Sequence, residues 1–293
     1  MLQQEIIDVS EKNKSKSINF SELRNNLQDE ELIKILPNNF YIDRKVELKT
    51  AELFDDVWKS FGNEELEEAY NLLSHRFKIN NIPLALIKDK NVLDIGCGSG
   101  RYSVALKMMG AKNVIGIDMG DGKKFMREGV GYMKGNALNL PFDNNSFDFV
   151  FSNGVFQHTR HNYKCISEME RVMKPGAYAY LFILGKCKLH DMLEQFRRAF
   201  KIANSEDFRK ILELYRFPKG KRFFLTDILF VPVRTYVSRK EHEAKLRNIG
   251  FSEMRFLDRG MDYDFPEQVY HNKELEEYLG KNGDGELRYL IKK

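Results

Sequence analysis

The chain has 293 residues, of which 42% are hydrophobic and 31% are charged, and its formal net charge is +4. This composition is typical of a globular protein with a sizeable core. The longest apolar run, at 178–185, is too short to cross a bilayer, and the first residues lack the apolar segment of a signal peptide. Three cysteines without paired spacing do not indicate a disulfide framework, so we expect a cytoplasmic protein with no membrane span.

Residues 1–84 are predicted to form a mainly helical, polar extension. Within 50–62, four apolar side chains are spaced along one face of a helix: Phe54, Val57, Trp58 and Phe61. This face could simply pack on the core. It could also form a cap in which Trp58 closes over a ligand, and we carry Trp58 as a candidate cofactor contact.

From residue 91 onward, apolar runs of β type alternate with helical patterns. The runs are 91–96, 113–118, 131–136, 147–153 and 177–184. This alternation predicts an α/β fold, in which a mostly parallel sheet is covered by helices on both faces. Ligands of such sheets bind beyond the carboxyl ends of the strands. We expect 85–186 and 236–293 to form this core together.

Residues 187–235 interrupt the alternation and are predicted to be an inserted lid. The segment contains two amphipathic helical patterns and then an aromatic stretch at 222–233. Residues 186–222 carry eleven Lys and Arg against five Asp and Glu, which indicates either a solvated helical face or a surface that attracts an anionic substrate. After the lid, Ser238 and Glu241 form a capping box for a helix that Gly250 ends, and 251–258 and 286–293 read as two final strands.

The sequence NVLDIGCGSGRYS at 91–103 places a glycine-rich turn between a strand and a helix, where backbone N–H groups attract an anionic ligand. The dinucleotide fingerprint G-x-G-x-x-G requires a third glycine at the position of Arg101, so the pattern disfavours NAD. Asp118 ends the next strand, twenty positions after Gly98. A carboxylate at that place can accept hydrogen bonds from the ribose of an adenosine ligand.

Four motifs then occur in order: VLDIGCGSG, VIGID, GNALNLPFDNNSFDFVFSNGVFQH and MERVMKPGAYAYLF. Together they resemble the class I S-adenosylmethionine-dependent methyltransferases, specifically the type-11 methyltransferase-domain group. The resemblance is dense over 88–184, and EHEAKLRNIGF at 241–251 is similar to a late helix and strand of that group. It implies a Rossmann-like sheet of seven strands in the order 3-2-1-4-5-7-6, with the last strand antiparallel.

The resemblance also implies S-adenosylmethionine as the cofactor and assigns residues to it. The glycine loop would hold the methionine part through Asp94, Gly96, Cys97, Gly98 and Gly100. Asp118 would bind the ribose, and Met119 would pack on the adenine. Asn136, where the family commonly has Asp, and Ala137 would bind the adenine edge, while Asn153 would line the methionine end.

Methyl transfer from a sulfonium is an in-line displacement, for which the protein mainly aligns the reacting atoms. A general base is needed only for a protonated hydroxyl or amine, and His158 is the best candidate for that role. His158 could instead merely line the pocket. With His161 and Cys165 it forms H-x2-H-x3-C, but no fourth ligand is evident and we predict no metal site.

Candidate substrate residues are aromatic and basic side chains next to the glycine loop and in the lid: Tyr102, Arg216, Arg222, Phe223, Phe224, Phe230 and Tyr236. Their mixture favours a small-molecule substrate with an anionic group, methylated on oxygen or nitrogen. Two alternatives stay open. One is an RNA methyltransferase whose basic lid grips phosphates, and the other is a non-catalytic protein that binds the cofactor and serves a partner. The sequence does not determine the oligomeric state.

Overall fold

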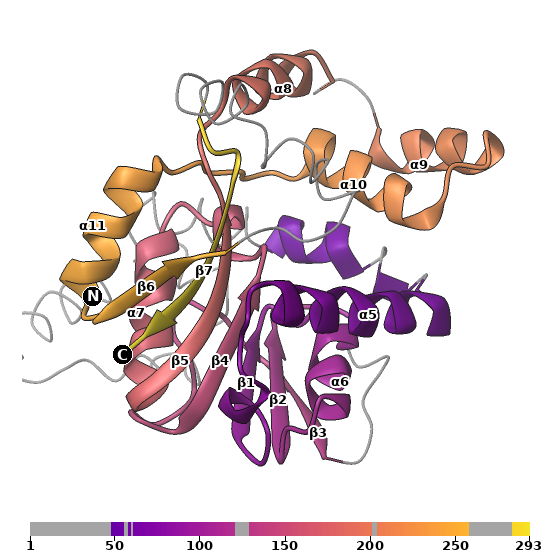
Figure 1. Ribbon diagram of the computed structural model, residues 1–293. Helices are drawn as coiled ribbons and strands as arrows, with labels where there is room; N and C mark the ends of the chain where they lie inside the picture. The colour runs from indigo at the N-terminus through magenta and orange to yellow at the C-terminus, as the bar shows by residue number, and fades with distance from the viewer. Residues whose placement is uncertain (1–47, 56–57, 60, 121–128, 201–203, 258–282) are drawn as a thin grey trace, which may run out of the picture. The chain divides into compact units, whose positions relative to one another are not determined.

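The structure is a computed structural model that describes residues 48–55, 58–59, 61–120, 129–200, 204–257 and 283–293 (Figure 1). All of them belong to one unit of the chain, Val46–Lys293. Most of the predicted N-terminal extension, and Val57 of its apolar face, therefore lie outside the described residues. The same holds for the side chains of 198–200, 219–221, Phe223 and Phe224.

A seven-stranded sheet with the order β3-β2-β1-β4-β5-β7-β6 forms the centre of this unit. Its strands are β1 (Asn91–Ile95), β2 (Asn113–Asp118), β3 (Val130–Lys134), β4 (Phe147–Asn153), β5 (Met173–Leu184), β6 (Glu253–Phe256) and β7 (Glu286–Lys292). The first five strands pair in parallel, and β7 is antiparallel to both β5 and β6. The predicted fold class and strand order are confirmed.

Two hydrophobic clusters lie on the two faces of the sheet. Successive side chains of a strand point to opposite faces, so Val92 packs into one cluster and Leu93 into the other. Phe149 and Val150 of the neighbouring strand β4 divide in the same way. All four side chains are fully buried, which is why the parallel strands read as continuous apolar runs in the sequence.

Helices cover both faces of the sheet (Figure 1). The cluster that holds Val92 also takes side chains from α5 (Asn63–Ile79) and α6 (Arg101–Met108). The opposite cluster takes side chains from α7 (Asn162–Val172) and α11 (Arg239–Ile249). Two short 3-10 helices, η1 (Leu84–Leu86) and η3 (Phe156–His158), complete the core elements before α7.

Helix α11 begins after Ser238 and ends at Gly250, as the sequence predicted. The capping interaction differs from the expected one, because the Ser238 hydroxyl donates to the Glu241 carboxylate across 2.7 Å and makes no bond to the helix backbone. The positive φ of Gly250, 128°, ends the helix in a conformation that glycine adopts without strain.

The inserted segment forms three helices, α8 (Lys188–Phe200), α9 (Ser205–Leu214) and α10 (Lys219–Phe230). The aromatic stretch that begins at residue 222 is helical as far as Phe230. Because α8 directly follows β5, the three helices lie beyond the carboxyl ends of the parallel strands (Figure 1). The two ends of the segment meet where Lys186 N–H donates to the Val237 carbonyl and Val237 N–H donates to that of Leu184.

Candidate functional site

A cavity of about 1700 Å³ opens between the carboxyl ends of the strands and the inserted helices. One wall comes from the core: the glycine loop after β1, the end of β2 and the loops after β3 and β4. The opposite wall comes from Thr50, Ala51, Phe54 and Trp58, from α5 and from the inserted segment. The cavity therefore lies where an open parallel sheet binds its ligands.

The glycine loop follows a path that requires glycine at three positions. Gly96, Gly98 and Gly100 all have a positive φ, at 72°, 52° and 83°. A Cβ on Gly96 would lie 2.3 Å from Val155 Cγ2, and a Cβ on Gly98 would lie 2.7 Å from Trp58 Cε2. The Gly96-x-Gly98-x-Gly100 spacing thus has two structural reasons. The loop backbone has positive φ values that other residues would adopt only with strain, and the side chains of Val155 and Trp58 pack directly against the loop.

Asp118 is joined to this loop by its carboxylate. Its Oδ2 accepts a hydrogen bond from Gly98 N–H across 2.8 Å, and its Oδ1 accepts one from Gly120 N–H across 2.9 Å. Burial raises the pKa of Asp118, and the two N–H donors work in the opposite direction. The carboxylate lines the cavity in a fixed orientation, at the place where the sequence predicted a ribose contact.

Asp94 occupies a different place from the other loop residues. It is buried and accepts a 2.6 Å hydrogen bond from the Ser103 hydroxyl, so it links β1 to α6 and is not among the described residues that line the cavity. Burial raises its pKa to about 7, and the charge of Asp118 adds to this effect. Cys97 does line the cavity, and burial raises the pKa of its thiol.

Trp58 covers the glycine loop from the opposite wall. Its indole stacks on Phe54 with 6.0 Å between ring centroids and meets Phe61 edge-on at 5.1 Å. The guanidinium carbon of Arg101 lies 5.8 Å from the Trp58 ring centroid and 5.0 Å from those of Phe61 and Tyr102. Aromatic rings and an arginine thus surround the start of α6, in an arrangement that favours cation–π contacts.

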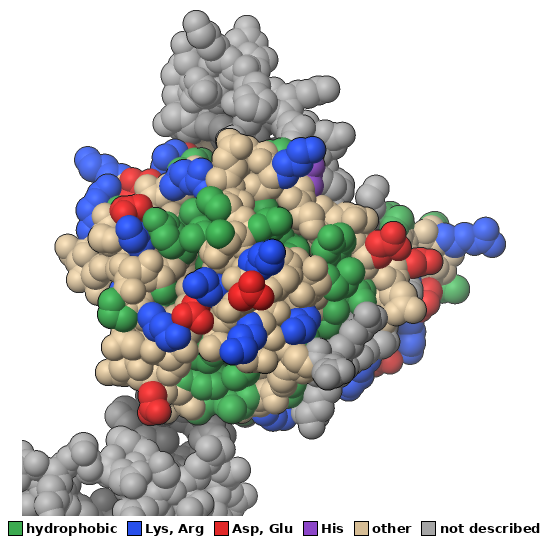
Figure 2. Space-filling view, turned by 60° about the horizontal axis from the view of Figure 1, so that its bottom comes forward, with side chains coloured by type: hydrophobic (Ala, Val, Ile, Leu, Met, Phe, Trp, Pro, Cys, Tyr) green, Lys and Arg blue, Asp and Glu red, His purple; other side chains and the backbone are tan. Residues whose placement is uncertain are grey.

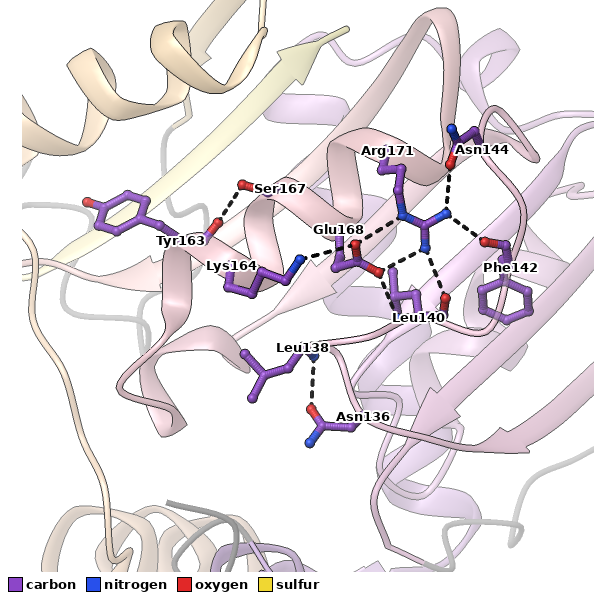
Figure 3. Close-up of polar contacts among 10 residues, drawn as sticks. All are labelled: Asn136, Leu138, Leu140, Phe142, Asn144, Tyr163, Lys164, Ser167, Glu168 and Arg171. Atoms are coloured by element: carbon purple, nitrogen blue, oxygen red, sulfur yellow. Dashed lines mark hydrogen bonds and ion pairs between the residues drawn. The ribbon is translucent and has the colours of Figure 1, made fainter. Parts of the chain in front are cut away.

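Met119, Asn136 and Ala137 line the same wall as Asp118. The side chain of Asn136 bonds to its own loop, where Oδ1 accepts from Leu138 N–H across 2.9 Å (Figure 3). The Asn136 carboxamide is therefore held against its own loop at the cavity wall.

The loop that carries Asn136 is held by two side chains of α7 (Figure 3). Glu168 Oε2 accepts from Leu140 N–H across 2.8 Å, and the Arg171 guanidinium donates to the carbonyls of Leu140 and Phe142 at 2.9 and 2.7 Å. Glu168 and Arg171 also form an ion pair of 2.8 Å. Arg171 belongs to the MERVMKPGAYAYLF motif, but nothing in that motif indicated that its side chain holds the loop of Asn136.

His158 lies at the end of η3 and contacts the inserted segment. Its Nδ1 is 3.2 Å from the Val233 carbonyl oxygen, which can only accept, so the proton of the neutral ring sits on Nδ1 and leaves Nε2 unprotonated. Nε2 lies 3.7 Å from Asp227 Oδ1. Burial lowers the pKa of His158, and Asp227 partly offsets this. A neutral imidazole whose Nε2 faces the cavity suits proton abstraction.

The structure places the predicted substrate residues unevenly. Tyr102 lines the cavity, whereas four residues are not among the described residues that do so: Arg216, Arg222, Phe230 and Tyr236. Arg216 is exposed, Arg222 pairs with Glu213 at 3.2 Å, Phe230 packs on Phe208, and the Tyr236 hydroxyl donates to Glu194. The side chains of Phe223 and Phe224 lie outside the described residues.

Other residues of the inserted segment face the cavity instead: Leu189, Leu193, Phe217, Leu225, Asp227, Ile228 and Arg234. Leu189 and Leu193 belong to the amphipathic pattern of α8, which indicated an apolar face but not what that face would contact. Asp227 stands alone as an acidic residue within the apolar stretch of α10, and that isolation is the signal by which the sequence could have identified it.

Two kinds of feature are absent from the described residues. Those residues contain no group of three or more His, Cys, Asp and Glu side chains placed to hold a metal ion. Among the helices that they form, none is both long and apolar enough to cross a membrane.

Residues 93–181 match a family model described as a methyltransferase domain. The malonyl-[acyl-carrier protein] O-methyltransferase of Methylococcus capsulatus is 24% identical over 65% of this chain and 62% of its own length. A tRNA U34 carboxymethyltransferase of Campylobacter hominis is 29% identical over 47% of each chain. Among solved structures, a chain from the complex of the Haloferax volcanii Trm112 methyltransferase activator with a methyltransferase aligns over 82% of this chain and 96% of its own, with a TM-score of 0.52 and 17% identity.

The sheet order, the glycine loop and the family match all indicate the same class of domain. The matched region is a class I S-adenosylmethionine-dependent methyltransferase domain, as the four motifs indicated. It lies within the type-11 group of such domains, and the Haloferax likeness shows the same fold. This chain spans between 20% and 62% of the length of the first curated relatives it matches.

Proposed function

We propose that the protein is an S-adenosylmethionine-dependent methyltransferase that acts on an oxygen or nitrogen atom of a small molecule. The observation that carries the proposal is the single cavity that joins two sets of groups. The glycine loop and Asp118 belong to one set, and the other set is His158 with the residues of the inserted segment that it contacts. A methyl donor and an acceptor can therefore meet in one enclosed space.

Several features of the core wall fit the methionine end of the cofactor. Asn153 Oδ1 lines the cavity, is buried and has no hydrogen-bond partner among the described residues, so it can accept from the ammonium group. The N–H groups of Gly96 and Cys97 are engaged with the Ile117 carbonyl. The carboxylate would therefore use the unsatisfied N–H groups in the first turn of α6.

The nucleoside end fits the neighbouring strand ends. The Asp118 carboxylate is fixed at the cavity wall and can take the ribose hydroxyls, while Met119, Asn136 and Ala137 surround the place of the adenine. Trp58 lies over the loop and would cap the bound cofactor. Asp94 supports the loop from beneath through Ser103.

When bound, the cofactor supplies a methyl group on a sulfonium, which is strongly electrophilic. The protein would align the acceptor with it and exclude water, which can contribute about 7–11 kcal/mol to lowering the barrier. His158 Nε2 would take the proton of an acceptor hydroxyl or amine, and the Asp227 carboxylate 3.7 Å away would stabilise the resulting imidazolium.

The charges of the inserted segment favour a small molecule over RNA. Three of its basic side chains form ion pairs within the segment: Arg197 with Glu194, Lys210 with Glu206 and Arg222 with Glu213. Three of the eleven basic side chains of 186–222 therefore already have an acidic partner.

Titration calorimetry of the full chain tests the proposal. We expect S-adenosylhomocysteine and S-adenosylmethionine to bind with one site per chain and NAD not to compete. Preferential binding of NAD would contradict the assignment. Unmodified tRNA serves as the second titrant: an affinity that falls steeply with added salt would favour the RNA alternative.

A further inference from the structure

A buried pair of opposite charges from the inserted segment lines the cavity. Asp227 comes from α10, Arg234 comes from the segment that follows it, and both line the cavity. Arg234 Nη1 is 3.3 Å from Asp227 Oδ2, and the two side chains are only 5% and 14% exposed. Neither residue was singled out by the sequence, and the cofactor does not account for either.

The pair is incompletely satisfied. Asp227 Oδ1 and the Nε and Nη1 atoms of Arg234 are buried and have no hydrogen-bond partner among the described residues. Gln157 Oε1, which comes from η3 after β4 and lines the same cavity, is also buried without a partner among the described residues. Buried charges are costly unless they are both paired and hydrogen-bonded. A polar ligand that completed these bonds would therefore gain much of its affinity here.

The open atoms define which groups such a ligand must present. Asp227 Oδ1 lies 3.7 Å from His158 Nε2, which is itself 3.4 Å from the amide nitrogen of Gln157. Asp227 Oδ1 is therefore the open acceptor, and a hydroxyl or amine of a ligand can donate to it. Arg234 Nη1 makes the ion pair with Asp227, whereas the buried Nε–H has no partner among the described residues and requires an acceptor, best a carboxylate or carbonyl oxygen.

We propose that Asp227 and Arg234 form the specificity-determining subsite for the methyl acceptor, and that they select a compound with a hydroxyl or amine next to a carboxyl group. This proposal rests on the proposed function, because it assigns the acceptor end of the same cavity. The remaining lining from the inserted segment is largely apolar, with Leu189, Leu193 and Phe217, so the rest of the acceptor can be hydrophobic.

Mandelate serves as the probe, because it has a hydroxyl and a carboxylate on one carbon that also bears a phenyl group. Phenylacetate lacks the hydroxyl, benzyl alcohol lacks the carboxylate, and O-methylmandelate blocks the donor. Binding is measured by calorimetry with the full chain, both ligand-free and saturated with S-adenosylhomocysteine. We expect mandelate to bind about 10- to 100-fold more tightly than each of the other three compounds, because each of them loses one charge-assisted or donor contact.

Amino-acid variants distinguish an effect on this subsite from an effect on folding or on the cofactor site. Asp227→Asn and Arg234→Gln should reduce mandelate affinity to that of the single-group compounds while S-adenosylhomocysteine affinity stays unchanged. Lys210→Gln removes an exposed charge from the same inserted segment and should behave as the wild type. Equal binding of all four compounds, or unchanged mandelate binding in both subsite variants, would overturn the proposal. Failure of S-adenosylhomocysteine to bind would overturn the proposed function instead, and mandelate selectivity in the ligand-free protein would still support the subsite.

Discussion

The Asp118 carboxylate accepts a hydrogen bond from the backbone N–H of Gly98 across 2.8 Å. The end of β2 is thereby connected to the glycine loop after β1, although twenty positions separate the two residues. A change in either residue should consequently affect both the shape of the loop and the binding of the cofactor.

Replacing Asp118 with alanine should weaken S-adenosylhomocysteine binding about 100-fold, since hydrogen bonds to a charged group are each worth about 1.5–3 kcal/mol. The fold should remain, because Asp118 is a desolvated carboxylate whose removal leaves the hydrophobic clusters intact. Calorimetry measures the affinity and thermal unfolding measures the stability. Unchanged affinity in a folded Asp118→Ala variant would contradict the placement of the ribose.

Gly98→Ala should destabilise the protein and displace Trp58. The new Cβ would sit at a φ of 52° and 2.7 Å from Trp58 Cε2. Gly176→Ala is the matched control, because its φ of 76° carries a similar strain of about 1–2 kcal/mol while nothing lies within 4 Å of the added atom. Chemical unfolding measures the two costs, and the larger loss should belong to Gly98→Ala.

Because Trp58 is the single tryptophan of the chain, its fluorescence reports the surroundings of the glycine loop in the same variants. Emission from Trp58 should shift in Gly98→Ala and stay as in the wild type in Gly176→Ala. S-adenosylhomocysteine should also change the wild-type emission, since Trp58 lies over the loop that binds it. An emission spectrum insensitive to both the ligand and Gly98→Ala would show that Trp58 does not cap this site.

Glu168 should make folding stability depend on pH in the acidic range. Burial alone would raise its pKa, but the hydrogen bonds from Arg171 and from Leu140 N–H outweigh burial and lower it below the ordinary 4.5. The folded protein therefore binds this proton less readily than the unfolded chain. The stabilisation is complete above pH 4.5 and is lost as the pH falls through the pKa of the folded state.

Urea unfolding between pH 7 and pH 3 tests this expectation with Glu168→Gln beside the wild type. At pH 7 the variant should be about 1.5–3 kcal/mol less stable, because Arg171 and Leu140 N–H lose a charged partner. The difference should shrink toward acidic pH. A difference that is constant with pH would mean that the charge of Glu168 does not contribute.

His158→Gln should slow methyl transfer about 100- to 10,000-fold to an acceptor hydroxyl or amine, while leaving S-adenosylhomocysteine affinity unchanged. Because burial lowers the pKa of His158 below 6.5, the ring stays neutral near pH 7 and becomes protonated only in more acidic solution. The rate of S-adenosylhomocysteine formation should therefore be flat around pH 7 and fall at lower pH. A wild-type pH profile retained by the variant would exclude a base role for His158.

The strands of the core were predictable because their signal is local. The runs at 113–118 and 147–153 coincide with β2 and β4, since continuous apolar sequences bounded by turn residues have few other ways to bury themselves. The strand predicted at 177–184 begins earlier, at Met173, because pairing with Phe147 extends it back through the K-P-G sequence at 174–176. Pairing between distant residues decided that boundary.

The candidate site was predictable in part for the same reason. The residues that shape the cofactor wall, Gly96, Gly98 and Asp118, lie in short motifs whose backbone conformation dictates the amino acid. Asp94 shares a motif with them but faces Ser103 beneath the loop. A motif thus identifies a group of residues without stating which of them faces the ligand.

The amino-acid sequence by itself determined the α/β fold and most of its strands, because apolar periodicity and turn residues are constraints that each segment satisfies locally. The strand order was implied by the resemblance of four motifs to a known family. Only the tertiary structure decided which side chains of the inserted segment line the cavity. There Arg222 and Tyr236 bond to lid carboxylates, while Asp227 and Arg234 face the cavity. His158 meets the Val233 carbonyl across 75 positions of sequence, and the orientation of such side chains follows from how whole helices pack.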